Sequence, residues 1–238
     1  MNFENDSASI TLAWDELSRS LCKEHGYHRV GGFNLPTKTA WACYEPGGPM
    51  LHIDFLTGEP LYDHGFAQVK GFSEGLACVR NADYQWTHHI LPNSQPAYGN
   101  RFQNVGRFFE GLADAQDETG SFHITPKGEP AYKKRFISVG HFSQGVAVAR
   151  DESGCFHIYP DGKSLYKVRN FVSVGPFEAT GEAIAWAIFQ LQNKDGEKRR
   201  VILSTRIDRR GRILKKRKGF TVVRPTNTDI DNYRRKTY

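Results

Sequence analysis

The sequence of 238 residues lacks both closely spaced cysteines and long hydrophobic runs. Its four cysteines are far apart, which excludes a C-x-x-C metal or redox motif, and a chain of this length does not need disulfides for stability. No segment approaches the roughly 18 uninterrupted apolar residues of a membrane span. The first residues, MNFENDSASI, lack the basic and apolar regions of a signal peptide. We therefore expect a reduced, cytoplasmic protein that has no membrane partner.

Catalytic and cofactor-binding motifs are also missing. The sequence contains no G-x-S-x-G frame, no G-x-G-x-x-G fingerprint and no P-loop. Asp54, Asp161 and Asp208 lie beside turns, where aspartate commonly hydrogen-bonds the backbone, and they form no paired-carboxylate motif. The sequence therefore assigns no catalytic residue, no metal ligand and no cofactor, and it predicts that the protein is not an enzyme. An active site assembled from loops on a repeat scaffold is the alternative.

Two phrases alternate along the chain and define internal repeats. The first, F-x-x-V-G-x-F-x-x-G-x-A-x-A, occurs with small changes at 66–79, 102–115, 136–149 and 171–185, and a degenerate copy begins at Tyr27. The second contains His-Ile followed by a turn, as in FHITPKGEPAYK and FHIYPDGKSLYK. Its histidines recur at intervals of 37, 34 and 34 residues, and Arg206 takes the fifth place. We count five repeats.

Each repeat is predicted to contain three short β-strands. GVAVARD alternates valine with small or polar residues, and CFHIY is short, aromatic and β-branched. PDG and PKG are turn tripeptides, and KSLYK and EPAYK after them are predicted as third strands. Glycine and proline interrupt every potential helix within about ten residues, which excludes a helical repeat of the same length.

Glycine and phenylalanine recur at equivalent positions for structural reasons. Glycine recurs where the chain re-enters its first strand, either because a side chain would clash there or because φ is positive. Phenylalanine recurs just before it and is predicted to fill the core between repeats, while base stacking on exposed rings is the alternative. The predicted structural residues are Phe72, Gly75, Phe108, Gly111, Phe142, Gly145, Phe177 and Gly181, together with His52, His89, His123 and His157.

The four histidines have two interpretations. On the axis of a closed ring they would bind a metal, since imidazole suits Zn, Cu, Fe or Ni. Alternatively, each ring is half-buried and its nitrogens bond to neighbouring backbone. The structural interpretation is favoured, because the charge of Arg206 would repel a metal and a set of tyrosines recurs equally well. These are Tyr62, Tyr98, Tyr132 and Tyr166.

Three short strands bury too little surface to be stable alone, so neighbouring repeats must stack or pair. The predicted fold class is all-β, with five three-stranded repeat units in a propeller-like ring or a β-solenoid and one amphipathic helix before them. Incomplete phrases at Tyr27 and Phe220 favour the closed ring, because each can complete the interface of the other.

The alternation of F-S-x-G-L-A-x-V with x-x-I-D-x-x-G-K-x-x-Y resembles the WG-repeat proteins of bacteria. The resemblance covers about 200 residues, from Tyr27 to Pro225, on the basis of these repeat signals. Phe-His at 122–123 and 156–157, and His-His at 88–89, replace the Trp-Gly pair of that family. The resemblance implies an all-β repeat array and implies little about activity.

The segment SASITLAWDELSRSLCKEHG, before the repeats, predicts an amphipathic helix of about four turns. Ser7 or Ser9 is the predicted cap, Gly26 ends the helix, and the apolar stripe contains Ile10, Trp14, Leu17 and Leu21. We expect this stripe to cover an open face or edge of the β array. Docking of a partner or of a second copy is the alternative. The predicted domains are the helix at 1–26, the repeats at 27–225 and a basic tail at 226–238.

Positive charge is concentrated near the end of the sequence. Residues 193–238 contain 16 Lys or Arg and 5 Asp or Glu, a net charge of +11, so the rest of the chain carries −5 of the total of +6. Such a cluster contacts phosphates of nucleic acid, complements an acidic protein surface, or is a solvated face. The candidate basic binding surface contains Arg199, Arg200, Arg206, Arg209, Arg210, Arg212, Lys215, Lys216, Arg217 and Lys218.

The sequence thus predicts a non-catalytic repeat scaffold that binds a macromolecular partner, and a protein is the favoured partner. The first alternative is an RNA- or DNA-binding module that uses the basic fifth repeat and tail. The second is a metal-binding or hydrolytic protein with an unrecognised site. The oligomeric state is not predicted.

Overall fold

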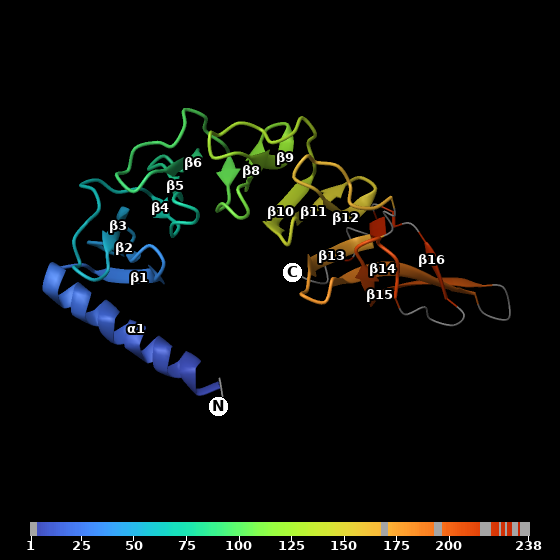
Figure 1. Cartoon of the computed structure of the whole chain (residues 1–238), viewed down its shortest axis with the longest axis horizontal. Coiled ribbons are helices and arrows are strands. Elements are labelled where there is room, and N and C mark those ends of the chain that lie inside the picture. The colour runs from blue at the N-terminus through green and yellow to red at the C-terminus, as the bar shows by residue number, and fades with distance from the viewer. Residues whose placement is uncertain are drawn as a thin grey trace. The chain divides into compact units, whose positions relative to one another are not determined.

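The computed structural model describes residues 4–167, 171–192, 197–214, 220–223, 225–226, 228–229 and 233, and the side chains of all of these except 4–12, 191–192 and 220. β-Strand is the main secondary structure of the described chain, and helix α1 (Glu4–His25) precedes the strands (Figure 1). The chain divides into two compact lobes. The first lobe contains residues 1–108 and 126–128, and the second contains residues 109–125 and 129–238.

The first lobe contains two antiparallel sheets of three strands each, ordered β1-β2-β3 and β4-β5-β6. Neighbours in these sheets are consecutive in the sequence, so short hairpin connections suffice to join them. A further short strand, β7, also belongs to this lobe. The strands are β1 (Arg29–Asn34), β2 (Thr39–Cys43), β3 (Met50–Asp54), β4 (Gln68–Val69), β5 (Ala77–Arg80), β6 (Thr87–Ile90) and β7 (Asn104–Val105).

Helix α1 packs on the first sheet through part of the predicted stripe. Leu21 is buried in the core of the first lobe, and Trp14 and Leu17 pack against that core. The helix ends at His25, directly before Gly26 with φ +72°. The predicted cap is wrong, because the helix begins at Glu4 and both serines lie inside it.

The second lobe contains the β8-β9 hairpin and a seven-stranded antiparallel sheet. Six strands of this sheet follow the order β10 to β15, and β16 pairs with β14. Its longest hairpin joins β14 and β15, which are eleven residues each. The strands are β8 (Ala113–Asp117), β9 (Gly120–Ile124), β10 (Ser138–Ser143), β11 (Val146–Asp151), β12 (Gly154–Ile158), β13 (Phe171–Phe177), β14 (Glu182–Gln192), β15 (Lys198–Asp208) and β16 (Phe220–Val223).

The recurring hairpin glycines are required by the backbone conformation. Gly75, Gly111, Gly145 and Gly181 have φ between +77° and +83°, and a Cβ added at any of them would meet nothing within 4 Å. The first three follow a residue that also has positive φ, the pattern of a type I′ hairpin turn. Positive φ, and not a clash, is therefore the reason for glycine here.

The third strand of each repeat does not lie where the sequence predicted it. EPAYK and KSLYK form only single bridges with the preceding strand, between Ile124 and Pro130 and between Ile158 and Ser164. The third ladder is instead formed by the strand before the hairpin glycine, such as β4 and β10. Proline at three of these bridges, at positions 60, 96 and 130, has no N–H to continue a ladder. The bridges at Ser164 and Ile213 are also single, although neither position is proline.

None of the four cysteines, Cys22, Cys43, Cys78 and Cys155, forms a disulfide. Among the described residues, no helix is both long enough and apolar enough to cross a membrane.

Candidate binding groove

Each recurring histidine links its own repeat to the next one. In the fourth repeat, Nδ1 of His157 lies 2.8 Å from the Tyr166 hydroxyl, and Nε2 lies 2.9 Å from the carbonyl oxygen of Gly175. His52, His89 and His123 have the same two kinds of partner. The tyrosines are Tyr62, Tyr98 and Tyr132, and the carbonyl oxygens belong to Lys70, Gly106 and Gly140. Both ring nitrogens are thus engaged in every case.

These bonds define the protonation state of the histidines. A carbonyl oxygen only accepts, so Nε2 carries the proton, and Nδ1 accepts a hydrogen bond from the tyrosine hydroxyl. Burial lowers the pKa of each of these rings to about 4, because the charged form loses its hydration. Burial also raises the pKa of the tyrosine partners, that of Tyr62 to about 12. The pairs are therefore neutral near pH 7.

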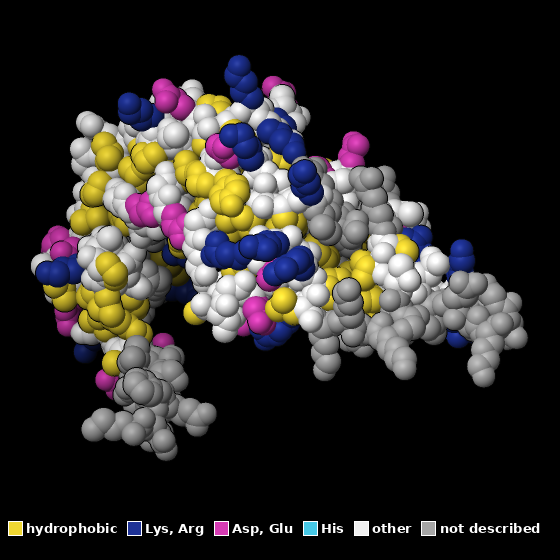
Figure 2. All heavy atoms as spheres, turned by 45° about the vertical axis from the view of Figure 1, so that its right-hand side comes forward, with side chains coloured by type: hydrophobic (Ala, Val, Ile, Leu, Met, Phe, Trp, Pro, Cys, Tyr) yellow, Lys and Arg dark blue, Asp and Glu magenta, His cyan; other side chains and the backbone are white. Residues whose placement is uncertain are grey.

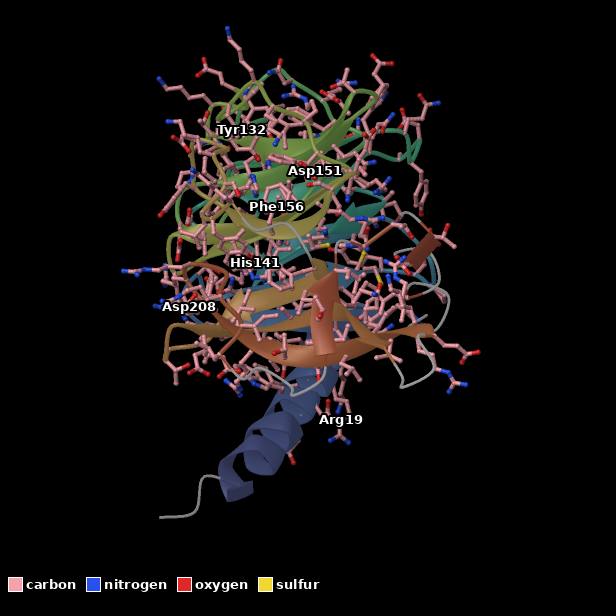
Figure 3. All side chains as sticks on the ribbon, turned by 90° about the vertical axis from the view of Figure 1, so that its right-hand side faces the viewer. Arg19, Tyr132, His141, Asp151, Phe156 and Asp208 are labelled. Atoms are coloured by element: carbon pink, nitrogen blue, oxygen red, sulfur yellow. The ribbon has the colours of Figure 1, made fainter. Side chains whose placement is uncertain are left out.

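Phenylalanine and glycine complete each junction. The rings of Phe72, Phe108, Phe142 and Phe177 are buried, and their centroids lie 4.3–4.6 Å from the histidine of the preceding repeat. The turn glycine of a repeat lies under the preceding tyrosine. A Cβ on Gly162 would lie 2.7 Å from Cγ of Tyr132, and Gly128 and Gly211 are in the same contact with Tyr98 and Tyr166. Figure 3 shows Tyr132 and Phe156 among the side chains of the second lobe.

The histidines and turn aspartates are thus occupied by structural contacts. No group of three or more His, Cys, Asp or Glu side chains that could hold a metal occurs among the described residues. Asp54 Oδ1 accepts the backbone N–H of Leu56, and Asp161 Oδ1 accepts that of Lys163. Asp208 Oδ1 likewise accepts two backbone N–H groups, from Arg210 and Arg212.

The candidate basic surface is partly neutralised by neighbouring acids. Arg206 Nη1 lies 3.0 Å from Glu178 and 3.2 Å from Glu182, and Arg212 pairs with Asp208 at 2.6 Å. Arg200 pairs with Asp229 at 2.8 Å. On the face seen in Figure 2, Lys and Arg side chains lie in several separate groups, with Asp and Glu beside some of them.

Three other arginines of this surface have different surroundings. Arg209 donates to the backbone oxygen of Gln144, and its guanidinium lies 5.0 Å from the ring centroid of Phe177. Arg199 and Arg210 are exposed, and neither forms an ion pair within the part of the chain that the structure describes. The remaining predicted residues, Lys215, Lys216, Arg217 and Lys218, lie outside the described residues.

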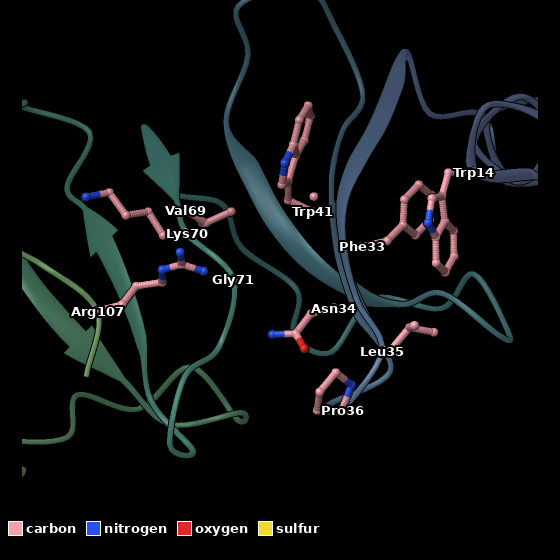
Figure 4. A pocket seen from close by; sticks show the side chains of 11 residues that line it. Trp14, Phe33, Asn34, Leu35, Pro36, Trp41, Val69, Lys70, Gly71 and Arg107 are labelled. Atoms are coloured by element: carbon pink, nitrogen blue, oxygen red, sulfur yellow. The ribbon is translucent and has the colours of Figure 1, made fainter. Parts of the chain in front are cut away.

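The first lobe contains an open groove of about 800 Å³ that the sequence analysis did not predict (Figure 4). It lies between the strands β1 and β2 on one side and the segment that follows β4 on the other. Its lining consists of Trp14, Gly32, Phe33, Asn34, Leu35, Pro36, Trp41, Val69, Lys70, Gly71 and Arg107.

Glycine at the same phrase position in the first two repeats leaves space for this groove. In the first repeated phrase, the second residue after the valine is Gly32 in the first repeat and Gly71 in the second. The same position carries Arg107, His141 and Pro176 in the later repeats. An alignment of the five copies of the phrase shows this difference. Glycine at this position in the first two copies was the signal in the sequence that indicated space without side chains here.

The two tryptophans of the groove are held in place by their neighbours. Trp41 lies on the backbone of β1, since a Cβ on Gly32 would lie 2.5 Å from its Cδ1 and Nε1. Trp14 stacks on Phe33, with ring centroids 4.7 Å apart and an interplanar angle of 14°. Asn34 donates from Nδ2 to the carbonyl oxygen of Phe72 at 2.6 Å, a bond that connects the first two repeats. The groove is therefore built on fixed side chains.

No family model and no curated protein matches the sequence. Solved structures similar to the chain include three Hsv2 structures. Kluyveromyces lactis Hsv2 has a TM-score of 0.45 and 8% identity, over 75% of this chain and 59% of that chain. KlHsv2 with loop 6CD replaced by a Gly-Ser linker has a TM-score of 0.43 and 10% identity, over 76% and 72%. Kluyveromyces marxianus Hsv2 has a TM-score of 0.40 and 10% identity, over 83% and 78%. None of these comparisons assigns the chain to a family.

Proposed function

We propose that this protein is a non-catalytic repeat scaffold that binds a partner protein in the groove of the first lobe. The observation that carries the proposal is the groove itself, an open space of about 800 Å³ with two tryptophans and two cations in its lining. Binding sites are typically concave, and a small number of polar or charged groups in them give specificity. Aromatic residues and arginine are also the residues that dominate protein interfaces.

The scaffold role is supported by the contrast between recurring and varying positions. The recurring histidine, phenylalanine and tyrosine side chains bond or pack with one another at the junctions between repeats. By contrast, the second position after the valine of the first phrase carries residues such as Gly71, Arg107 and His141. The side chain there differs in size and charge from repeat to repeat. A repeat scaffold uses its constant residues for stacking and its variable surface residues for recognition.

A five-repeat, WG-like organisation is part of this proposal. It is supported by a backbone hydrogen bond that recurs within every copy of the His-Ile phrase. The N–H of Leu61 donates to the carbonyl oxygen of His52 in the first copy, and the N–H of Leu214 donates to that of Arg206 in the fifth. The intermediate bonds join Ala97 to His89, Ala131 to His123 and Leu165 to His157. A cytoplasmic location also belongs to the proposal and is supported by the four cysteines, which are not joined in disulfides.

Nucleic-acid binding is the second candidate function, and the exposed Arg199 and Arg210 on and beside β15 are the observation that favours it. Fluorescence polarisation with single-stranded RNA and duplex DNA, at about 50 and 200 mM salt, tests it. Affinity that falls at least tenfold over this range, and is reduced by Arg199→Glu with Arg210→Glu, would favour this function. Absence of binding at the lower salt would rule it out.

The groove proposal is tested by closing the groove without straining the backbone. A Cβ on Gly71 would meet only Asn34 Nδ2, at 3.7 Å, and the backbone there does not have positive φ. Gly71→Leu should therefore fold normally and fill the groove. The matched control is Gly99→Leu in the same lobe, because a Cβ on Gly99 would meet nothing within 4 Å.

The measurement is quantitative affinity capture of the partner from lysate of the source cells, with mass-spectrometric identification, followed by binding of the purified partner. We expect Gly71→Leu to weaken that binding at least tenfold and Gly99→Leu to leave it unchanged. A partner that binds the parent protein and the Gly71→Leu variant equally would show that the groove is not the binding site.

A further inference from the structure

The lining of the groove differs between its two sides, and this difference bears on the ligand. Figure 4 places Trp14, Phe33 and Leu35 on one side, Lys70 and Arg107 on the other, and Trp41 between them. Both charged side chains of the lining are cationic, and no Asp or Glu belongs to it. The ligand that fits therefore presents an apolar group to one side and negative charge to the other.

The apolar side is incompletely covered in this chain. Leu35 is 63% exposed, although it lies in the loop directly after β1 and beside the stacked Trp14 and Phe33. A single exposed leucine is ordinary, but here it lines the same groove as Trp14 and Phe33, and Pro36 follows it. Removing these apolar side chains from water favours an aliphatic or aromatic side chain of a partner at this side.

The cationic side of the groove carries a lysine at a position where the other repeats carry glycine. The first residue after the valine is glycine in four repeats, at positions 31, 106, 140 and 175, whereas the second repeat has Lys70. The carbonyl oxygen of Lys70 still accepts from His52 Nε2, so the backbone of the junction is retained while the side chain lines the groove. Lys70 and Arg107 together favour carboxylates, which accept charge-assisted hydrogen bonds from both.

Nucleic acid would satisfy the same charge, but the tryptophans are poorly placed for base stacking. One face of Trp41 lies on Gly31 and Gly32, and the Arg29 guanidinium carbon lies 5.5 Å from its ring centroid. One face of Trp14 is stacked on Phe33. Single-stranded nucleic acid needs open ring faces and a track of cations along several phosphates. A lining with two cations and partly covered indoles fits a peptide better.

From this charge complementarity we infer that the groove binds an extended acidic segment of the partner protein, with an aliphatic or aromatic anchor on the Trp14 side and carboxylates on the Lys70 side. This inference rests on the proposed function and specifies the chemistry of its partner.

The test is selection of random 12-residue peptides, displayed on phage, by the full-length protein. Peptides that also bind the Gly71→Leu variant are removed in each round, so that only groove ligands remain. We expect the surviving peptides to be enriched in Asp and Glu and to contain a conserved aliphatic or aromatic residue. Synthetic versions of the best peptide should bind at least tenfold more weakly when Asp and Glu are changed to Asn and Gln.

Charge reversal then locates the carboxylates. Lys70→Glu with Arg107→Glu should weaken the acidic peptide at least tenfold and should strengthen a version in which Lys replaces Asp and Glu. The matched control is Lys23→Glu with Lys133→Glu, which makes the same charge change at exposed positions outside the lining and should change affinity less than twofold.

The outcomes separate this inference from the proposed function. Survivors that are neutral or basic, or that bind the control and groove variants alike, would overturn the acidic ligand while leaving a peptide-binding groove. Absence of any peptide dependent on an open groove would overturn both. A 12-residue oligothymidylate that binds the parent protein and not Gly71→Leu, measured by polarisation, would replace the peptide with nucleic acid.

Discussion

The hydroxyl group of Tyr132 lies 2.6 Å from Nδ1 of His123, and Nε2 of the same ring lies 2.9 Å from the carbonyl oxygen of Gly140 in the following repeat. The imidazole thus accepts a hydrogen bond from within its own repeat and donates one to the next. Because His123 is fully buried, neither bond can be replaced by a bond to bulk water. The following predictions depend on this relationship and on the other contacts that hold the repeats together.

Tyr132→Phe should lower the free energy of unfolding by about 1–3 kcal/mol, the cost of a buried acceptor without a donor. Nδ1 of His123 cannot recover by changing tautomer, since Nε2 would then face the Gly140 carbonyl without a proton. The measurement is equilibrium unfolding in guanidinium chloride. Tyr159→Phe removes an exposed hydroxyl of the same lobe and is the control. Equal losses in the two variants would contradict the role of the Tyr132 hydroxyl.

Acid should destabilise the protein between pH 6.5 and about 4. The four histidines have a folded-state pKa of about 4 and an unfolded-state pKa of 6.5, so the unfolded state binds more protons in this range. Their stabilisation is complete above pH 6.5 and is lost as the pH falls, to the extent of about 3 kcal/mol per histidine.

Guanidinium chloride unfolding at pH 7.5, 6.0 and 5.0 measures this dependence. His157→Gln should reduce the proton uptake on unfolding by up to one proton. A free energy of unfolding that stays constant over this pH range would show that the buried rings bind protons equally in the folded and unfolded states.

Gly145→Ala should lower the free energy of unfolding by about 1 kcal/mol or more, because alanine is strained at the φ of +78° found there. Gly140→Ala is the matched control, since its backbone is not left-handed and its added Cβ would come no closer than 3.9 Å to Val148. Gly145→Asn should recover part of the loss, because asparagine tolerates the left-handed region. Thermal unfolding of the three variants checks the order.

Trp14→Ala should detach α1 from the first sheet and lower the free energy of unfolding on the order of 2 kcal/mol, through loss of the Phe33 stack and of buried area. Limited proteolysis should cleave the variant within the helix before the strands are cut. Glu16→Ala changes an exposed residue of the same helix and should keep the parent pattern. Protection of the helix in Trp14→Ala would mean that Leu17 and Leu21 alone hold it.

The sequence predicted the repeated β organisation because each junction requires the same residue types at the same spacing. The glycines at 75 and 111 are an example, since only positive φ closes their turns. The third strand was misplaced because local β-propensity does not register that proline ends a ladder at Pro130. The choice between a closed ring and a solenoid stays a prediction, because it depends on small rotations between repeats that no local pattern encodes.

The groove was missed for a different physical reason. Its defining feature is the absence of side chains at Gly32 and Gly71, and an absence has no periodic pattern of its own. The basic cluster, in contrast, was visible in the sequence, but its partners Glu178 and Asp229 are distant in the chain from Arg206 and Arg200. Net charge along a sequence therefore overstates the positive charge that these arginines present to a ligand.

The link between His123 and Gly140 also bears on how such a chain can grow. The second, third and fourth repeats each carry one donor ring for the repeat after it and one acceptor carbonyl for the repeat before it. A tandem duplication of residues 125–158 would copy both the acceptor carbonyl of Gly140 and the donor ring of His157. The added repeat would therefore form the same histidine–carbonyl hydrogen bonds with its neighbours. Arg206 occupies the histidine position of the fifth phrase and forms ion pairs with Glu178 and Glu182 instead. Insertion of a repeat before that point would therefore retain the histidine junction, whereas insertion after it would not.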